Sequence, residues 1–243
     1  RGMMETYRRK GVQKMDTLLW YVAISWDYVA QMLPCMFLAA IAFFALRPWR
    51  KRRLARRGLA SGVWRETVLL LFAMFSAGLA ALTVFPANFW TLYHWQEAFQ
   101  GREAFFPLTP LSQSAQYIGW RPYFLWSFQT MGSWTFYMAM ANALIFMPVG
   151  FFPNLLWRPR WWKGLLTGFC ASFSIEFLQL FVNRSTDVDD LILNTLGAFA
   201  GGLTALLLRR LAPRFTQHFQ VEVQHGRETG DRGPAPGAGA GQL

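Results

Sequence analysis

Five apolar segments constrain the fold of this chain more than any other feature. About 18 to 20 apolar residues in a helix are long enough to cross the roughly 30 Å hydrocarbon core of a membrane. Each of the five segments reaches or nearly reaches that length. We therefore predict an all-α, polytopic helical membrane protein with about five spans: Tyr28–Leu46, Val68–Phe85, Trp134–Phe152, Gly164–Val182 and Leu191–Leu208.

The composition excludes an ordinary soluble domain. Hydrophobic residues make up 53% of the chain and aromatic residues 17%, with 12 Trp and 23 Phe. Because several segments are long enough to span the membrane, the first cannot be a cleaved signal peptide on its own.

A net charge of +11 could indicate nucleic-acid binding, but the distribution of the charge along the chain excludes that function. The basic residues cluster in alternate connections between the apolar segments, which is the positive-inside pattern of a membrane protein. We interpret them as topology signals that also attract anionic lipids. They are Arg47, Arg50, Lys51, Arg52, Arg53, Arg56, Arg57 and Arg65, then Arg158, Arg160 and Lys163, and finally Arg209, Arg210 and Arg214.

With the basic connections in the cytoplasm, the loops 86–133 and 183–190 face outward and the C-terminus is cytoplasmic. Residues 1–27 form a basic N-terminal segment, in which we predict an interfacial helix over 12–26. A second crossing does not fit before Leu46, because two crossings need about 40 residues. The first span and its basic loop then occupy 28–64 and the main membrane domain 65–211. The cytoplasmic tail is 212–243, with a Gly/Pro/Ala composition typical of disorder from Gln224 on.

The loop 86–133 is long for a connection and too aromatic for disorder. We expect it to lie on the outer membrane surface with short re-entrant helices. Cys35 and Cys170 fall in opposite halves of the membrane, so we expect them not to pair.

Polar residues form a stripe on one face of three predicted spans. Ser172, Glu176, Gln179 and Asn183 are spaced i, i+4, i+7 and i+11, which places them within about 60° of arc on a helix. Asp190 and Asn194 begin the same spacing in the last span, and Asn142 lies at a similar depth in the third. A carboxylate facing lipid is costly, so Glu176 indicates a bundle interior or a wet cavity.

We therefore predict an outward-facing polar cleft between the last three spans. Its candidate catalytic residues are Glu176 and Asp190, and its candidate ligand-binding residues are Asn142, Gln179, Arg184, Asp187, Asp189 and Asn194. A divalent cation at Asp187, Asp189 and Asp190 is the one cofactor that the pattern suggests.

Simpler interpretations exist for several of these residues. Asn and Gln often hydrogen-bond between membrane helices without further function, and one Asp would cap the last span. Gly197 and Gly201 predict close helix packing. The sequence has no HExxH, GxSxG or P-loop motif.

Three motifs in the C-terminal half resemble the VanZ-like family of bacterial membrane proteins. They are "NALIFMPVGFFPNLL", "SFSIEFLQLF" and "NRSTDVDDLILNTLGAFAGG", in the order and spacing of that family, and "FFPLTPLSQS" resembles its outer-loop stretch. The resemblance covers about 65–211. Two positions depart from the pattern, since Asn183 replaces a Gly and the Asn before the loop Pro-Phe pair is missing. The family's motif residues fall on Asn142, Pro148, Gly150, Glu176, Gln179, Arg184, Asp187, Asp189, Asp190, Asn194 and Gly197.

The resemblance implies a multi-pass protein of the bacterial cytoplasmic membrane associated with tolerance of teicoplanin, a lipid-tailed glycopeptide. Its expected partners are membrane lipid and a lipid-linked cell-wall precursor or the lipoglycopeptide itself. One hypothesis is a module that binds or shields such a ligand in the cleft. Another is an enzyme on an outer-leaflet lipid-linked substrate, with Glu176 as acid or base and the Asp cluster binding cation or substrate. A transporter is disfavoured because no internal repeat is present.

Overall fold

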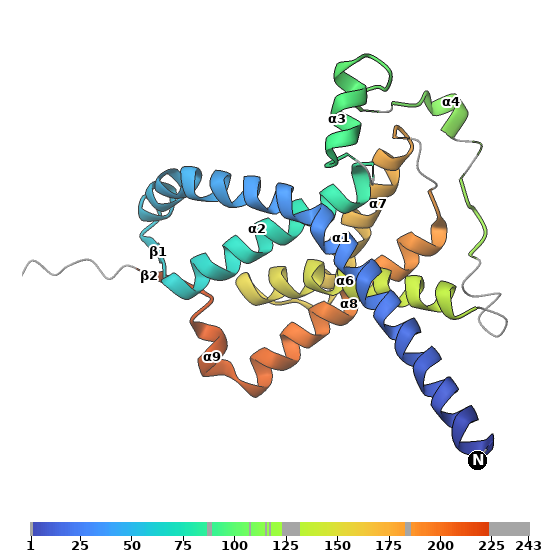
Figure 1. Ribbon diagram of the computed structural model, residues 1–243. Helices are drawn as coiled ribbons and strands as arrows, with labels where there is room; N and C mark the ends of the chain where they lie inside the picture. The colour runs from blue at the N-terminus through green and yellow to red at the C-terminus, as the bar shows by residue number, and fades with distance from the viewer. Residues whose placement is uncertain are drawn as a thin grey trace, which may run out of the picture.

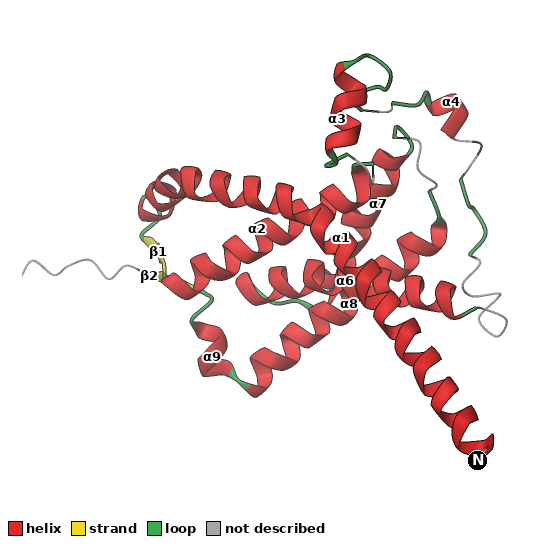
Figure 2. Ribbon diagram, viewed as in Figure 1, coloured by secondary structure: helices red, strands yellow, loops and turns green. Residues whose placement is uncertain are grey.

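The computed structural model of the chain describes residues 2–86, 89–106, 108–114, 116, 118–122, 132–182 and 186–223, with the side chains of 2–18, 133 and 134 left undescribed. The described part is almost entirely helical, as predicted (Figure 2). The predicted disorder from Gln224 on lies outside the described residues. The elements are α1 (Gly2–Ala55), β1 (Leu59–Ser61), α2 (Val63–Val84), α3 (Leu92–Phe99), α4 (Leu111–Ser114), α6 (Ser133–Leu156), α7 (Trp161–Gln179), α8 (Val188–Leu211), α9 (Pro213–Gln217) and β2 (Val221–Val223).

Helices long and apolar enough to cross a membrane confirm the predicted class. Among the described residues there are 4 of them, Leu19–Ala55 in α1, Val63–Val84, Thr135–Leu156 in α6 and Val188–Leu211. The remaining expected span corresponds to α7, a helix of 19 residues. α7 is long enough to cross a membrane, but no 18-residue window in it, with Lys163, Glu176 and Gln179 near its ends, reaches the hydropathy of those in the other four.

The N-terminal region forms one helix rather than an interfacial helix followed by a separate span. α1 runs without interruption for 54 residues and contains Pro34 and Pro48. Its N-terminal part projects away from the other helices (Figure 1). Tyr137 of α6 contacts α1 at this level, because its hydroxyl lies 2.6 Å from Ser25 Oγ. Residues 12–26 are helical, as predicted, within a helix that continues into the first span. Their interfacial position stays a prediction.

Close contact between α6 and α8 forms the centre of the membrane domain. A Cβ added at Gly197 or Gly201 would lie 1.9 Å from the backbone oxygen of Ala143 or Met147, respectively. Gly150 of α6 meets α8 in the same way, since its Cβ would lie 1.8 Å from the Ala198 oxygen. The two backbones therefore touch directly, and the predicted close packing at Gly197 and Gly201 is confirmed.

The end of the domain that carries most of the basic residues, here called the basic end, is closed by the C-terminal segment. Here β1 pairs antiparallel with β2, Leu59 opposite Val223. Arg65 is only 6% exposed. Its Nη1 donates to the carbonyl oxygens of Leu156 at 2.8 Å and Phe219 at 3.1 Å. Helices leave their last carbonyls without intrahelical partners, so this arginine satisfies the end of α6.

Two further side chains bind the same end of α6. Gln220 Nε2 donates to Leu155 O at 2.7 Å. Arg209 Nη1 donates to the carbonyl oxygens of Asn154 at 3.2 Å and Trp157 at 3.0 Å. Arg65 and Arg209 are therefore structural ligands of α6, a role that charge patterning alone did not predict.

The opposite end, here called the loop end, carries α3 and α4, which lie beyond the main bundle (Figure 1). Phe85, Phe89 and Trp90 form an aromatic cluster here, with ring centroids 4.8 to 5.7 Å apart. Thr109 N donates to Phe181 O at 2.9 Å, which ties the loop to the segment that follows α7. Cys35 and Cys170, the two cysteines, are both free, as predicted.

Candidate functional site

A cavity of about 240 Å³ lies between α1, α2, α6, α7 and α8. It brings together five of the predicted site residues, Asn142, Glu176, Gln179, Asp190 and Asn194. The rest of its wall is mostly apolar and consists of Tyr28, Leu79, Leu82, Thr83, Met138, Ala141, Ile145, Phe146 and Ile175.

Glu176 lies near the end of α7 with 6% of its surface exposed. Its Oε2 accepts a hydrogen bond from Asp187 N at 3.2 Å. Its backbone oxygen also accepts from Thr186 Oγ1 at 3.3 Å. Asp187 is the N-cap of α8, and the N-terminus of a helix favours nearby negative charge. Glu176 thus holds the start of α8 against the end of α7 while its side chain borders the cavity.

Asp190 faces α6 from the first turn of α8. Asn142 Nδ2 donates to Asp190 Oδ1 at 2.5 Å. This pair fixes the relative position of α6 and α8 at the cavity.

Asn194 joins α8 to α7 one turn further along. Its Nδ2 donates to Ser172 Oγ at 3.0 Å. Ser172 has no exposed surface and Asn194 is 5% exposed. The i, i+4 spacing of Ser172 and Glu176 therefore points both side chains toward α8, as the predicted stripe required.

The contact of Gln179 with α2 shows that the cavity has a further wall, which the sequence did not predict. Its Nε2 donates to the backbone oxygen of Thr83 in α2 at 2.9 Å. The predicted cleft involved only the last three spans, whereas α2 and α1 also contribute to the wall through Thr83 and Tyr28. Nothing in the sequence marked Thr83 as a residue of the cavity wall. Its hydroxyl donates to Leu79 O of its own helix, which is an ordinary bond for a helical Thr.

The remaining predicted residues lie away from the cavity or outside the described structure. Asp187 and Asp189 are half-buried at the start of α8 and do not line the cavity. Asp187 Oδ1 accepts from Asp189 N at 3.1 Å, the capping role that one Asp was expected to have. Arg184 lies outside the described residues.

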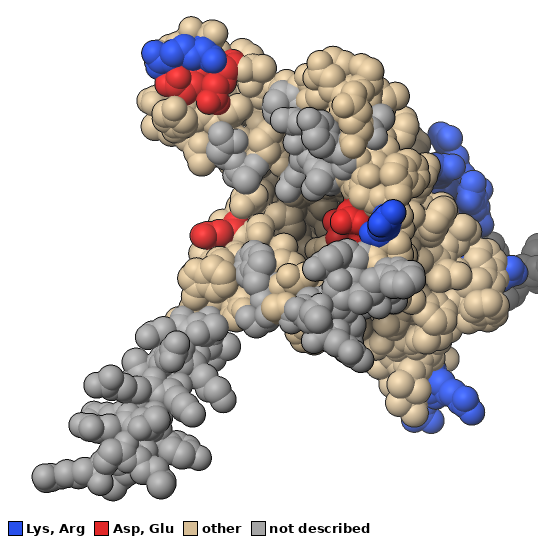
Figure 3. Space-filling view, turned by 90° about the vertical axis from the view of Figure 1, so that its right-hand side faces the viewer, with Lys and Arg blue, Asp and Glu red and all other residues tan. Residues whose placement is uncertain are grey.

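No group of three His, Cys, Asp or Glu side chains able to hold a metal ion occurs in the described part of the chain. In the structure Asp190 Oδ1 faces Asn142, and Asp187 Oδ1 faces the backbone of its own helix. A cation at Asp187, Asp189 and Asp190 therefore stays a prediction. Figure 3 shows the face toward which the N-terminal ends of α6 and α8 point. On this face, acidic and basic atoms lie next to each other beside a hollow.

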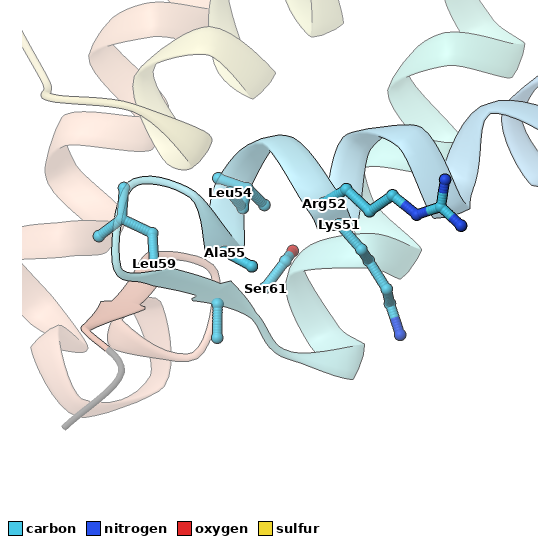
Figure 4. A pocket seen from close by; sticks show the side chains of 7 residues that line it. Lys51, Arg52, Leu54, Ala55, Leu59 and Ser61 are labelled. Carbon is cyan, nitrogen blue, oxygen red and sulfur yellow. The ribbon is translucent and has the colours of Figure 1, made fainter. Parts of the chain in front are cut away.

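A second hollow of about 350 Å³ lies at the basic end, between the last turns of α1 and β1 (Figure 4). Its walls include Lys51, Arg52, Leu59 and Ser61. The charged ends of Lys51 and Arg52 extend away from Leu59 (Figure 4). None of the predicted site residues lines this hollow, so it is distinct from the cavity described above.

The helical bundle and the partly open cavity between its helices define a polytopic membrane protein with a candidate site. Comparison with known families identifies this chain as a member of the VanZ/LLP1 family, whose model matches residues 69–209. The match confirms the resemblance seen over about 65–211, and it links the protein to glycopeptide resistance at the level of the family. No curated protein and no solved structure matches the chain.

Seven of the motif residues fall into two structural groups. Gly150 and Gly197 allow α6 and α8 to touch. Asn142, Glu176, Gln179, Asp190 and Asn194 line the cavity. The motifs therefore describe both a tightly packed helix pair and the polar surface that the pair presents to the cavity.

Proposed function

We propose that this VanZ/LLP1 protein lowers susceptibility to lipid-tailed glycopeptides by binding a lipophilic ligand in the cavity. That ligand is part of a lipid-tailed antibiotic or of a lipid-linked cell-wall precursor. The observation that carries the proposal is the cavity itself, which five polar side chains of the predicted site line together with mostly apolar residues. Small-molecule sites combine a mostly apolar wall with a few polar groups in the same way.

The cost of the polar residues supports a functional role. A carboxylate in a membrane segment is expensive, and such residues usually mark substrate or ion sites. Glu176 and Asp190 are two such carboxylate residues, and both line the same cavity. Helix association alone would not require both carboxylates, because neutral Asn and Gln side chains can join membrane helices.

The size of the cavity limits what can enter. Its volume of about 240 Å³ lies below the roughly 300 to 1,000 Å³ typical of sites for drug-sized ligands. We therefore expect one segment of the ligand to occupy the cavity while the bulk of a glycopeptide or precursor stays outside.

The test is a susceptibility assay with variants of the two cavity carboxylates. Glu176→Gln and Asp190→Asn are expressed in a susceptible bacterial host, and the inhibitory concentrations of teicoplanin and vancomycin are measured in parallel. Glu222→Gln is the control, because Glu222 is exposed in β2 and lies outside the cavity. We expect teicoplanin tolerance to fall in both cavity variants at equal membrane abundance. Tolerance equal to that of the unmodified protein in both variants would contradict the proposal.

The two carboxylates also support an alternative function. Glu176 and Asp190 border the same cavity, and paired carboxylates can act as general acid and base on a substrate held between them. In this alternative the protein is a membrane enzyme acting on an outer-leaflet lipid-linked substrate. Mass spectrometry of the precursor pool distinguishes the two functions: a covalently altered precursor would favour the enzyme, and an intact precursor would favour binding.

Both functions require the cavity to open toward the outer leaflet of the bacterial cytoplasmic membrane. The clustering of basic residues at the basic end supports a cytoplasmic position for that end and for the C-terminus. Cysteine-accessibility labelling provides the test, because a cysteine placed at Ser112 of α4 would be labelled from outside. Labelling of that cysteine only after the cells are opened would reverse the proposed topology.

A further inference from the structure

We infer that the last turns of α1 bind the terminal phosphate of a membrane lipid, at a site separate from the cavity. The site is a hollow of about 270 Å³ at the basic end, here called the arginine hollow, lined by Trp49, Arg52, Arg53 and Arg56. None of these four residues lines the cavity of the proposed function. The inference therefore rests on its own observations and goes beyond that function.

The spacing of the four residues places them on one face of α1. They follow the pattern i, i+3, i+4 and i+7, which is the spacing of a single helical face. α1 ends at Ala55, and Arg56 extends its last turn because Arg56 N donates to Arg52 O at 3.1 Å. The side chains therefore surround one hollow rather than spreading around the helix.

The three arginine side chains of the hollow lack the protein partners that neighbouring arginines have. Arg50 forms a salt bridge with Glu66 at 2.8 Å, and Arg65 donates to two backbone carbonyls. Within the described ranges, the guanidinium groups of the hollow form no hydrogen bond or ion pair, and no Asp or Glu occurs over 28–65 of the sequence. Like charges held together repel one another, so an anion among them would be stabilising.

Trp49 places the arginine hollow at the edge of the membrane. Its side chain is 59% exposed, and tryptophan is enriched where a membrane meets water. Arg53 Cζ lies 5.5 Å from the centroid of the Trp49 ring, which is within the range of a cation–π contact. The hollow is therefore at the level of the lipid head groups.

The residues that precede Trp49 favour a lipid over a soluble phosphate. Leu38, Ala42 and Ala45 lie on the same face of α1 as Trp49 and are exposed. They form an apolar stripe that leads along the helix to the arginine hollow. A hydrocarbon chain can lie along this stripe while its phosphate contacts the arginines.

Three guanidinium groups around one hollow favour a terminal phosphate over a phosphate diester. Each guanidinium is a planar fork of N–H donors that pairs with two phosphate oxygens. A terminal phosphate has three acceptor oxygens and carries about 1.5 to 2 negative charges near pH 7. A diester has one acceptor oxygen fewer and less negative charge, so it satisfies three arginines less completely.

The test measures lipid binding to the full chain in phosphatidylcholine nanodiscs by native mass spectrometry. Two lipids with identical diacyl chains are compared: phosphatidic acid, which has a terminal phosphate, and phosphatidylglycerol, which has a diester. We expect phosphatidic acid to be retained about tenfold more than phosphatidylglycerol. Equimolar glycerol 3-phosphate, a soluble form of the same head group, should leave the bound phosphatidic acid in place.

The preference must also depend on the arginine hollow. We expect it to be lost when Arg52→Gln, Arg53→Gln and Arg56→Gln are combined. A second triple variant replaces the same residues with Lys, which keeps the positive charge that orients α1 in the membrane but removes the planar forks. We expect this variant to insert normally and to show a reduced preference.

The matched control combines Arg47→Gln, Arg57→Gln and Arg214→Gln. It removes the same charge from exposed residues outside the hollow, so we expect it to keep the preference. This control separates a defined site from general attraction between basic residues and anionic lipids.

Three results would overturn the inference. The first is equal retention of the two lipids, and the second is displacement of phosphatidic acid by equimolar glycerol 3-phosphate, which would identify a soluble ligand. The third is a preference that survives in both triple variants of the hollow, or that falls as much in the control as in the Gln triple variant.

Discussion

Asn142 of α6 donates a hydrogen bond to Asp190 of α8 at the wall of the cavity, with 2.5 Å between Nδ2 and Oδ1. The two residues are 48 positions apart in the sequence, and their contact joins the helices that form the centre of the domain. It is a short hydrogen bond between two predicted site residues, so its loss should affect both stability and the cavity.

Replacing Asn142 with Leu should destabilise the folded protein. Removing one partner of a buried hydrogen bond costs about 1 to 3 kcal/mol, because the Asp190 carboxyl group is left with one donor fewer. We expect a lower midpoint of thermal unfolding for the purified protein in detergent. Ser174→Ala is the matched control, because the Ser174 hydroxyl is exposed and lies outside the cavity. Equal midpoints for Asn142→Leu and the unmodified protein would show that the contact contributes little.

Replacing Gly197 with Ala should separate α6 from α8. The new Cβ would lie 1.9 Å from Ala143 O, a backbone atom that cannot move without moving its helix. We expect a large loss of folded protein, measured as the monodisperse fraction in size-exclusion chromatography. The control is Gly132→Ala, where an added Cβ meets nothing within 4 Å. Similar yields for the two variants would contradict the close approach of the helices.

Replacing Arg65 with Met should loosen the basic end. The change removes the donor to Leu156 O and Phe219 O and leaves both carbonyls without that partner. The expected cost is about 1.5 to 3 kcal/mol. Limited proteolysis should then cut the segment 212–223 faster than in the unmodified protein. Arg214→Met should have no such effect, because Arg214 is exposed on α9; equal rates for Arg65→Met would contradict the proposed role.

The end of α3 should respond to acid through Glu97. A hydrogen bond from Arg102, with Nε 2.5 Å from Oε2, lowers the pKa of Glu97 below its usual 4.5. Because the folded-state pKa is lowered, the contribution to stability is complete above pH 4.5 and is lost as the pH falls through the lowered pKa. Hydrogen exchange corrected for its intrinsic rate should show protection of 97–103 decreasing over that range.

The matched variant for this acid response is Glu97→Gln, which cannot be protonated. We expect it to show low protection of 97–103 that does not change over the same range of pH. A decrease in protection that persists in Glu97→Gln would show that another group is responsible.

Helical periodicity predicted the polar face of the bundle well, because the side chains of a helix repeat every 3.6 residues. Glu176 and Gln179 are placed on one face by that rule, and the structure brings them to one cavity with Asp190. Periodicity could not show that α2 forms another wall. The contact there is made by the backbone oxygen of Thr83, and a backbone atom leaves no mark in the sequence.

Charge patterning was informative at a coarser level. It separated the basic connections from the others, but it could not distinguish an arginine in solvent from one that binds carbonyls. Arg65 and Arg209 bind the end of α6, and that role depends on where the C-terminal segment returns. In the same way, three aspartates within four positions suggested an ion, whereas the structure turns Asp187 toward its own backbone.

The direct contact between α6 and α8 also decides how the cavity can change shape. At Gly197 and Gly201 there is no side chain between the two backbones that could change rotamer, so the pair should move as one rigid body. Widening of the cavity then falls to its other wall, where Tyr28 of α1 and Leu82 of α2 face it. In this arrangement we expect α1 and α2 to form the gate through which the proposed lipophilic ligand would pass sideways from the bilayer.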